Sequence, residues 1–410
     1  MSFFDMKYSK FKWTLSLRTF KNTVLFSLIF IYGCQAQIEK STSNPVVTGA
    51  QQIDNYLPQL KDKGIGVVAN QTSIVANQKA QFTHLVDTLL ALDISVEKVF
   101  APEHGFRGKA DAGELVEDDI DKQTGLPIIS LYGKHKKPTP EDLEGIDLVV
   151  FDIQDVGVRF YTYISTLHYV MEACAEQNIP LLVLDRPNPN RHYVDGPQLE
   201  KKHQSFVGMH PVPVVYGMTI GEYALMINGE GWLKNGIQCQ LEVVPLRAYN
   251  DRILYDLPVK PSPNLPNSRA INSYPSLCFF EGTNVNAGRG TDVQFQVFGS
   301  PFLDPDIFEY QYTPRSNEGS QYPKNQDKLC FGKDLTGHEY LSEINLNWLL
   351  VAYNNTQDKG KFFMPFFTKL AGTEKLQQQI ENGVSAQQIK ASWQEDLETF
   401  KTIRKKYLLY

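Results

Sequence analysis

Short apolar segments that alternate with amphipathic helical segments constrain the fold of this chain more than any other feature. The apolar segments are five or six residues long and rich in Val, Ile, Leu and Phe, which is typical of strands buried on both faces of a parallel sheet. The segments 82–91 and 166–177 have apolar residues three and four positions apart, as helices do. The pattern predicts an α/β fold with a Rossmann-like, doubly wound parallel sheet, and its expected strands are 64–69, 95–100, 126–131, 148–153 and 180–184.

The character of the sequence changes near residue 255. Four prolines fall within residues 258–266, which excludes regular helix and central strand there. Farther on, a capping-box pattern at Ser385 opens a helical segment whose apolar stripe reaches Ile403. We therefore expect a Rossmann-like catalytic domain at residues 50–255 and a smaller α+β domain at residues 256–410 that completes the cleft.

The first 34 residues have the layout of an export signal. Five basic residues precede an apolar run at 24–32, which ends at Gly33 and Cys34. The run is too short for a stable membrane span. Gly33-Cys34 resembles a bacterial lipoprotein processing site, with Cys34 as the lipidated residue that attaches the protein to a membrane. A plain cleaved signal is the alternative. Residues 35–49 are polar and are expected to form a tether.

Charge and cysteine content exclude several classes of function. The formal net charge is −6, and cleavage before Cys34 would make it more negative, which argues against nucleic acid as a partner. The four later cysteines have no metal-binding spacing, so we expect them to be free and buried. The sequence predicts an acidic, exported protein, either periplasmic or anchored as a lipoprotein.

Polar side chains follow three of the predicted strands. Since the carboxyl ends of parallel strands meet at one edge of a sheet, these loops are expected to form one site. The first loop supplies Glu103, His104 and Arg107, and the third supplies Arg186 and Asn188. The second loop and the strand end before it supply Asp152, Gln154, Asp155, Arg159, Tyr161 and Tyr163.

Glu103 is the preferred acid–base group of this predicted site. It lies between Pro102 and Phe106 in a glycine-bounded loop, where a carboxyl group can be partly desolvated. A structural alternative pairs it with Arg107 or places it at a helix start. The aromatic residues around Arg159 suit stacking against a sugar, and they suit core packing equally well.

The second domain contributes four further candidates to the site. Glycine-rich and proline-rich segments there contain Asn264, Glu281, Asn284 and Arg289. Arg289 stands between two glycines and could clamp a substrate carboxylate through two hydrogen bonds. A turn residue that ties the two domains together is the alternative role.

No cofactor is expected. Gly64 and Gly66 fall at the start of a strand and are not followed by a third glycine, which disfavours a dinucleotide site. The P-loop and the Gly-x-Ser-x-Gly elbow are absent from the sequence. One function that remains open is a metal-dependent hydrolase of a phosphate or amide substrate, using Glu103, His104, Asp152 and Asp185.

The chain resembles the bacterial exo-β-N-acetylmuramidase family, formerly a domain of unknown function. The motifs that carry the resemblance are 102–108, 151–161, 185–190, 262–266 and 281–284. The resemblance implies a Rossmann-like domain, a smaller C-terminal domain and an active site in the cleft between them.

The resemblance to this family also implies an activity, the release of terminal, non-reducing N-acetylmuramic acid from peptidoglycan fragments such as MurNAc-β-1,4-GlcNAc. Glu103 matches the presumed catalytic acid, and Arg159 or Arg289 would bind the lactyl carboxylate. The second catalytic group stays open between Asp152, Asp155 and the acetamido group of the substrate. A lipoprotein that binds muropeptides without cleaving them is the non-enzymatic alternative.

Overall fold

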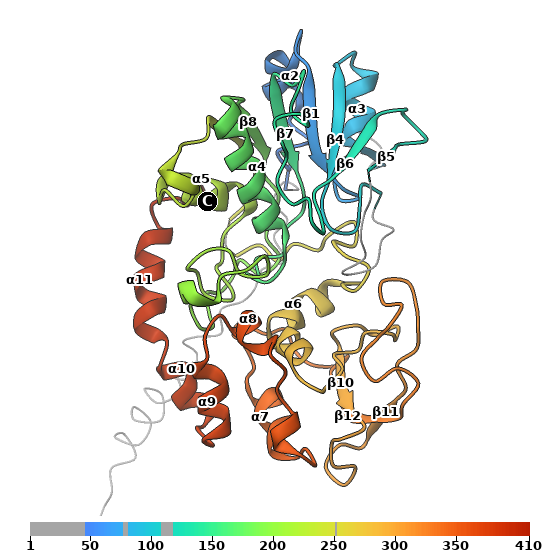
Figure 1. Cartoon of the computed structure of the whole chain (residues 1–410), viewed down its shortest axis with the longest axis vertical. Coiled ribbons are helices and arrows are strands. Elements are labelled where there is room, and N and C mark those ends of the chain that lie inside the picture. The colour runs from blue at the N-terminus through green and yellow to red at the C-terminus, as the bar shows by residue number, and fades with distance from the viewer. Residues whose placement is uncertain (1–45, 77–80, 108–117, 251) are drawn as a thin grey trace, which may run out of the picture. The chain divides into compact units, whose positions relative to one another are not determined.

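The computed structural model describes residues 46–76, 81–107, 118–250 and 252–410 (Figure 1). These residues all belong to one compact unit, Ser43–Tyr410. The predicted signal and the lipidation site at Cys34 lie outside the described residues, as does most of the predicted tether. Within the described ranges, no helix combines the length and apolarity that a membrane span needs.

A seven-stranded sheet forms the centre of the N-terminal half, in the order β5-β6-β4-β1-β7-β8-β9. All neighbouring pairs are parallel except β5 with β6. Without β5 the strand order is 3-2-1-4-5-6, the order of doubly wound nucleotide-binding folds. The predicted α/β class is therefore confirmed, and the strands are β1 Ile65–Ala69, β4 Val96–Ala101, β5 Asp119–Ile120, β6 Pro127–Ser130, β7 Leu148–Asp152, β8 Leu181–Leu184 and β9 Leu241–Val244.

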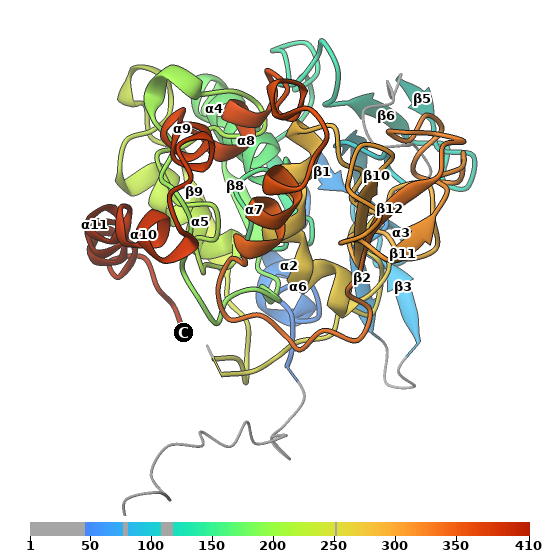
Figure 2. The same ribbon diagram turned by 90° about the horizontal axis from the view of Figure 1, so that it is seen from below.

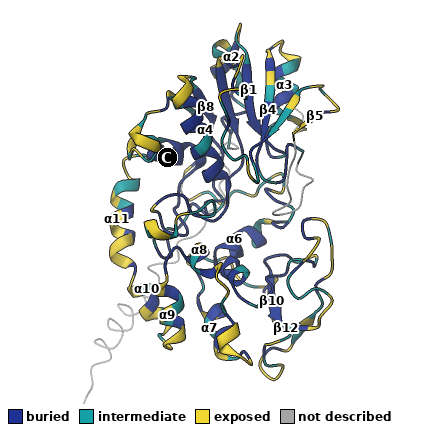
Figure 3. Ribbon diagram, in the orientation of Figure 1, coloured by how far each residue is buried: buried dark blue, intermediate teal, exposed yellow. Residues whose placement is uncertain are grey.

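The strands are buried because both faces of the sheet are covered. Val67 and Val150 point into an apolar cluster with helices α2 (Ile53–Leu60) and α3 (Leu85–Ala91). Val68 and Phe151 point into a second cluster with α4 (Tyr163–Gln177) and α5 (Ile220–Gly229). Figure 3 shows the central strands as buried ribbon. The continuous apolar segments of the sequence follow from this double coverage.

The predicted helix at 82–91 is shorter in the structure. Its first three residues, Phe82–His84, form β3, which pairs antiparallel with β2 (Ile74–Ala76). Helix α3 starts only after His84, whose side chain accepts a hydrogen bond from the backbone N–H of Val86. A cap at His84 thus sets the start of the helix, and the apolar spacing that began at Phe82 could not show it.

The C-terminal half combines a small antiparallel sheet with short helices. The sheet has the order β10-β12-β11. In Figures 1 and 2 these strands lie on one flank of this half, and α9, α10 and α11 lie on the other. The elements of this half are β10 Val297–Ser300, β11 Tyr310–Tyr312, β12 Cys330–Asp334, α6 Ser268–Leu277, α7 Asn347–Asn354, α8 Phe367–Ala371, α9 Lys375–Glu381, α10 Ala386–Ala391 and α11 Gln394–Arg404, with the 3-10 turns η3 Cys278–Gly282 and η4 Lys359–Lys361. Two further 3-10 turns, η1 Lys201–His203 and η2 Lys234–Gly236, belong to the N-terminal half.

The predicted capping box at Ser385 is present. The single helix expected after it is broken into α10 and α11, with Trp393 as the N-cap of the second. Among the described residues, Cys174, Cys239, Cys278 and Cys330 are free and buried, as predicted.

Candidate active site

A cavity of about 640 Å³ lies where loops from the carboxyl ends of the parallel strands meet the C-terminal half. The loop after β4 contributes Glu103 and His104, and the segment that leads into α4 contributes Tyr161 and Thr162. The C-terminal half contributes residues from η3 and from the segment 319–324. A volume of this size is typical of sites for small molecules, which occupy about 300–1,000 Å³.

A tight turn presents Glu103 to the cavity. His104 and Gly105 both have φ of +74°, and the Gly105 N–H donates a 3.0 Å hydrogen bond to the Pro102 carbonyl. The left-handed region is costly for a residue with a Cβ, so the His104 backbone is held there by its surroundings. The turn directs the Glu103 carboxylate at the start of α4.

Two hydroxyl groups hold the Glu103 carboxyl. Thr162, the N-cap residue of α4, donates a 2.7 Å hydrogen bond from its hydroxyl to Oε2. Its hydroxyl therefore does not cap the helix. The Tyr132 phenol also hydrogen-bonds Glu103, and burial together with this carboxylate raises the pKa of Tyr132. Both partners fix the orientation of the carboxyl group.

The wall formed by the C-terminal half carries an ion pair. Arg289 donates from Nε to a Glu281 carboxylate oxygen, and both side chains are 23% exposed. The guanidinium carbon lies 5.3 Å from the centre of the Phe295 ring. Burial alone would lower the pKa of Arg289, but the attraction of the Glu281 carboxylate is stronger, so the pKa of Arg289 is raised above its usual value. The pair offers a fixed cation to an anionic group in the cavity.

Lys324 fixes the segment 319–324 to this wall. Its ammonium donates to the backbone carbonyls of Phe280, Glu281 and Thr283, with 2.8 Å to the first. Burial lowers its pKa to about 8. Since Glu281 lies in η3, Lys324 helps to position the Glu281–Arg289 ion pair by binding the backbone of that turn. No pattern in the sequence identified Lys324 as a site residue.

Six of the residues predicted from the sequence line this cavity. They are Glu103, His104, Tyr161, Asn264, Glu281 and Arg289. Tyr161 donates from its hydroxyl to the Pro261 carbonyl at 2.7 Å, and the Asn264 amide donates to the Gly319 carbonyl at 2.6 Å. The prediction that the two halves of the chain contribute to one site agrees with this placement.

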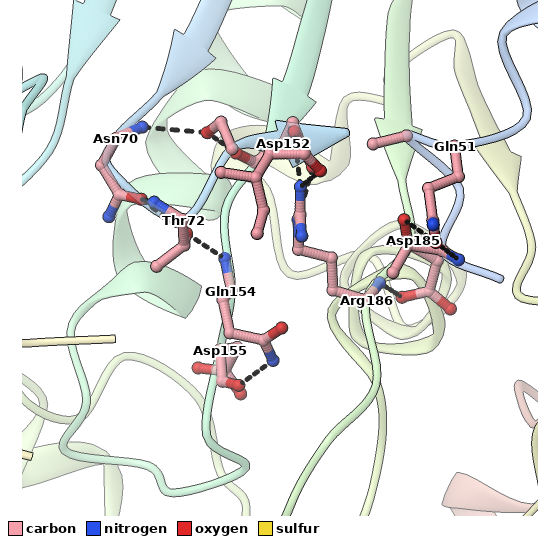
Figure 4. A network of polar contacts seen from close by, with 12 residues as sticks. Gln51, Asn70, Thr72, Asp152, Gln154, Asp155, Asp185 and Arg186 are labelled. Atoms are coloured by element: carbon pink, nitrogen blue, oxygen red, sulfur yellow. Dashed lines mark hydrogen bonds and ion pairs between the residues drawn. The ribbon is translucent and has the colours of Figure 1, made fainter. Parts of the chain in front are cut away.

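Asp152 and Arg186 lie in the interior, and neither is among the residues that line the cavity. Arg186 binds both oxygens of Asp152, with Nε at 2.6 Å and Nη2 at 2.8 Å (Figure 4). Asp152 is 0% exposed and Arg186 is 4% exposed. The pair ties the ends of β7 and β8 together, so the structure gives both residues a structural role in place of the predicted catalytic and binding roles.

Asp155, predicted as a nucleophile or base, is also enclosed and is not among the residues that line the cavity. Tyr216 and the Gly157 N–H donate hydrogen bonds to its Oδ2. Burial raises the pKa of Asp155 to about 6. Gln154 and Asn188 are likewise turned inward, since their amides donate to backbone carbonyls of Pro187 and Met218.

Arg159 does not reach the cavity, although the sequence placed it among the sugar-binding candidates. It is 0% exposed, and its guanidinium donates to four backbone carbonyls, those of Pro197, Val212, Leu370 and Ala371, at 2.7–2.9 Å. Burial lowers its pKa to about 9. Of the two arginines expected to bind the lactyl carboxylate, only Arg289 lines the cavity.

Three more predicted residues take structural roles. Arg107 pairs with Asp121 at 2.8 Å and with Asp87 at 3.4 Å. The Tyr163 hydroxyl accepts a 2.9 Å hydrogen bond from Asn70. The Asn284 carbonyl accepts a hydrogen bond from Ser300 at 3.0 Å. None of the three predicted residues is among those that line the cavity.

The predicted metal alternative finds no support in the arrangement of ligands. In the described ranges, no three His, Cys, Asp or Glu side chains come together as a metal site. Asp152 is bound to Arg186, and Asp185 accepts hydrogen bonds from Thr219 and Gly221.

The fold and the cavity together define an α/β enzyme of the kind that acts on saccharides. The cavity joins aromatic surfaces, one positioned carboxyl group and a cation on the other wall, which are the elements that recognise and cleave an acidic sugar.

The chain belongs to the exo-β-N-acetylmuramidase NamZ family. The model of the N-terminal part of that family matches residues 65–269, and the model of its C-terminal part matches residues 272–410. The peptidoglycan β-N-acetylmuramidase NamZ of Bacillus subtilis (strain 168) is 39% identical over 377 residues, which cover 87% of this chain and 89% of the relative.

Two crystal structures of DUF1343 family proteins from Bacteroides fragilis NCTC 9343 are similar to this structure. One has a TM-score of 0.82 at 46% identity and covers 90% of this chain and 99% of its own. The other has a TM-score of 0.74 at 27% identity and covers 89% and 99%. Both likenesses extend over the two halves of the fold.

Proposed function

We propose that this protein is an exo-acting glycosidase that releases terminal N-acetylmuramic acid from the non-reducing end of peptidoglycan fragments, with Glu103 as its general acid. Membership of the NamZ family supports the substrate class. The observation that carries the catalytic assignment is the carboxyl group of Glu103, held by Thr162 in the cavity.

In this mechanism Glu103 gives its proton to the glycosidic oxygen as the bond to the leaving sugar breaks. The transition state has oxocarbenium character, so a group on the other face of the ring stabilises it or attacks it. Asp152 and Asp155 are enclosed in the interior. The opposite face is then served by Glu281 or by the acetamido oxygen of the substrate itself, and the anomer released first distinguishes retention from inversion.

Arg289 has the role of recognising the lactyl carboxylate that distinguishes N-acetylmuramic acid from N-acetylglucosamine. Its Nε is engaged by Glu281, and its guanidinium lies against Phe295 at the cavity wall. A charge-assisted hydrogen bond to a carboxylate contributes about 1.5–3 kcal/mol. N-acetylglucosamine has no lactyl carboxylate and therefore lacks this contribution to binding.

The test is release of N-acetylmuramic acid from MurNAc-β-1,4-GlcNAc by the wild type and by Glu103→Gln. Glu144→Gln, at an exposed carboxylate outside this cavity, is the matched control. We expect release by the wild type and by the control, and a loss of about 10²–10⁴-fold in Glu103→Gln. A folded wild type that binds the disaccharide without cleaving it would favour the muropeptide-binding alternative.

We further propose that the protein is exported and anchored through a lipid on Cys34. The basic residues, short apolar run and Gly33-Cys34 junction of the first 34 residues support this. Palmitate labelling and membrane fractionation of the wild type and of Cys34→Ala would test it. Labelling that survives the substitution would reject Cys34 as the acylated residue, and a labelled soluble form would reject anchoring.

A further inference from the structure

One aromatic side chain at the cavity is almost fully solvated. Tyr322 is 89% exposed, the highest value for a large apolar side chain in the described part of the protein, and it lines the cavity that contains Glu103. Other aromatic residues of the same cavity, such as Tyr161, Tyr274 and Phe295, are buried by their neighbours. Tyr322 therefore does not contribute its ring to the core, and its place at the cavity leaves the ring accessible to a ligand bound there.

The backbone that carries Tyr322 is fixed on both sides of it. Before it, Gly319 accepts a 2.6 Å hydrogen bond from the Asn264 amide, and Ser320 exchanges two backbone hydrogen bonds of 3.1 Å with Asn317. After it, the ammonium of Lys324 is bound to three carbonyls around η3. The backbone that carries the ring is thus held in place although the ring itself is solvated, and binding a ligand to the ring orders little further backbone.

The chemistry of the position fits a sugar ring. An aromatic face packs against the C–H face of a pyranose, while the phenol and nearby polar groups meet its hydroxyls. The buried aromatic residues enclose the inner part of the cavity and suit the sugar that is cleaved off. A solvated ring at the same cavity suits the neighbouring sugar, which must remain continuous with the rest of the glycan outside.

We propose that Tyr322 binds the N-acetylhexosamine on the leaving-group side of the scissile bond and so makes the enzyme select substrates with a sugar at that position. This inference rests on the proposed function, because it takes Glu103 as the acid placed between the two sugars. Tyr322 acts here as a specificity-determining residue, and its ring is expected to contribute through substrate binding.

Two substrates distinguish binding of the leaving sugar by Tyr322 from a general effect of Tyr322 on catalysis. MurNAc-β-1,4-GlcNAc carries the leaving sugar, and the β-fluoride of N-acetylmuramic acid lacks it. We expect Tyr322→Ala to lower kcat/KM about tenfold for the disaccharide, which corresponds to a stacking contribution of about 1.4 kcal/mol. For the fluoride we expect less than about a twofold change. Tyr322→Phe and Tyr322→Trp should keep most of the disaccharide activity, since they keep an aromatic face.

Tyr340→Ala is the matched control, because Tyr340 is 49% exposed and is not among the residues of this cavity. Equal losses on both substrates, or no loss on the disaccharide, would overturn the role of Tyr322 and leave the proposed function intact. A folded wild type that cleaves neither substrate would overturn the proposed function, and this inference with it.

Discussion

The hydroxyl of Thr162 lies 2.7 Å from Oε2 of Glu103 and donates a hydrogen bond to it. This contact joins the first residue before α4 to the loop after β4, two segments that are 59 positions apart in sequence. It places the carboxyl group beside the amino end of α4, a 15-residue helix. The site therefore depends on the packing of the sheet against α4, since neither segment can form it alone.

Glu103→Gln should affect substrates according to how much their leaving group needs a proton. An N-acetylglucosamine leaving group needs one, so we expect a loss of about 10²–10⁴-fold on MurNAc-β-1,4-GlcNAc. Fluoride leaves without protonation, so the β-fluoride of N-acetylmuramic acid should lose far less. Steady-state rates on both substrates give the comparison. Equal losses would show that Glu103 acts in another step or supports the fold.

Thr162→Val should lower kcat because the Glu103 carboxyl loses the donor that orients it. A hydrogen bond to a charged group contributes about 1.5–3 kcal/mol, so the loss should be about tenfold to a hundredfold. Thr162→Ser retains the hydroxyl and should retain most of the activity. Rates are compared at saturating disaccharide, with thermal unfolding as the check on folding. Similar losses in Val and Ser would mean that the hydrogen bond alone does not explain the effect, because Thr162→Ser keeps the hydroxyl.

Arg289→Met should weaken the preference for N-acetylmuramic acid over N-acetylglucosamine at the non-reducing end. The guanidinium that faces the cavity is lost, and kcat/KM for the muramic acid substrate should fall at least about tenfold. The substitution also leaves Glu281 without its partner, so the double variant Arg289→Met/Glu281→Gln serves as the control. The ratio of kcat/KM for MurNAc-GlcNAc and GlcNAc-GlcNAc is the measurement. A ratio that stays constant in both variants would exclude Arg289 from recognition.

The sequence was sufficient for five of the seven strands of the sheet and for the loop that carries Glu103, because these depend on local patterns. It did not predict the two edge strands β5 and β9, which are short and partly exposed. Buried strands give continuous apolar runs, and polar loops follow their ends. The same logic could not separate Glu103 from Asp152, since both lie at strand ends. Only the fold shows that Asp152 faces a guanidinium inside the protein, while Glu103 faces the cavity.

Long-range partners explain the other differences. Arg159 lies next to aromatic residues in the sequence, which also suits a sugar site. Its carbonyl partners at Leu370 and Ala371 are more than 200 positions away, and backbone carbonyls leave no signal in a sequence. Lys324 and Tyr322 were also not identified from the sequence. Their segment has no regular secondary structure and no distinctive motif, so no local pattern marks them.

Asp155 should make stability fall as the pH rises from about 4 to about 6. Burial raises its pKa from 3.8 to about 6, so in this window the folded protein retains a proton that the unfolded chain has released. Folding is then favoured by acid, and ionisation of the buried carboxyl costs up to about 3 kcal/mol by the upper end of the window. Urea unfolding of the wild type and of Asp155→Asn between pH 4 and 7 tests this. The free energy of the wild type minus that of the variant should decrease across the window, and a constant difference would contradict the prediction.

Arg159 should contribute strongly to the stability of the contact between the two halves of the chain. Its guanidinium binds two carbonyls at Pro197 and Val212 and two at the end of α8, and no Asp or Glu among the described residues pairs with it. Arg159→Met removes the guanidinium from these buried carbonyls, of which that of Val212 keeps a second donor, the Leu199 N–H at 3.2 Å. Each carbonyl left without a donor costs about 1–3 kcal/mol, so we expect the free energy of unfolding to fall by at least about 3 kcal/mol.

Arg159→Lys should give an intermediate loss, because an ammonium has three donors at one point and cannot span four carbonyls. Arg247→Met, at an exposed arginine, is the control for removal of the charge alone. Because α8 also brings Leu370 to the cavity, the KM for the disaccharide should rise in Arg159→Met under conditions where the variant remains folded. A variant as stable as the control would show that water replaces the guanidinium at these carbonyls, and that the two halves are held together by apolar packing.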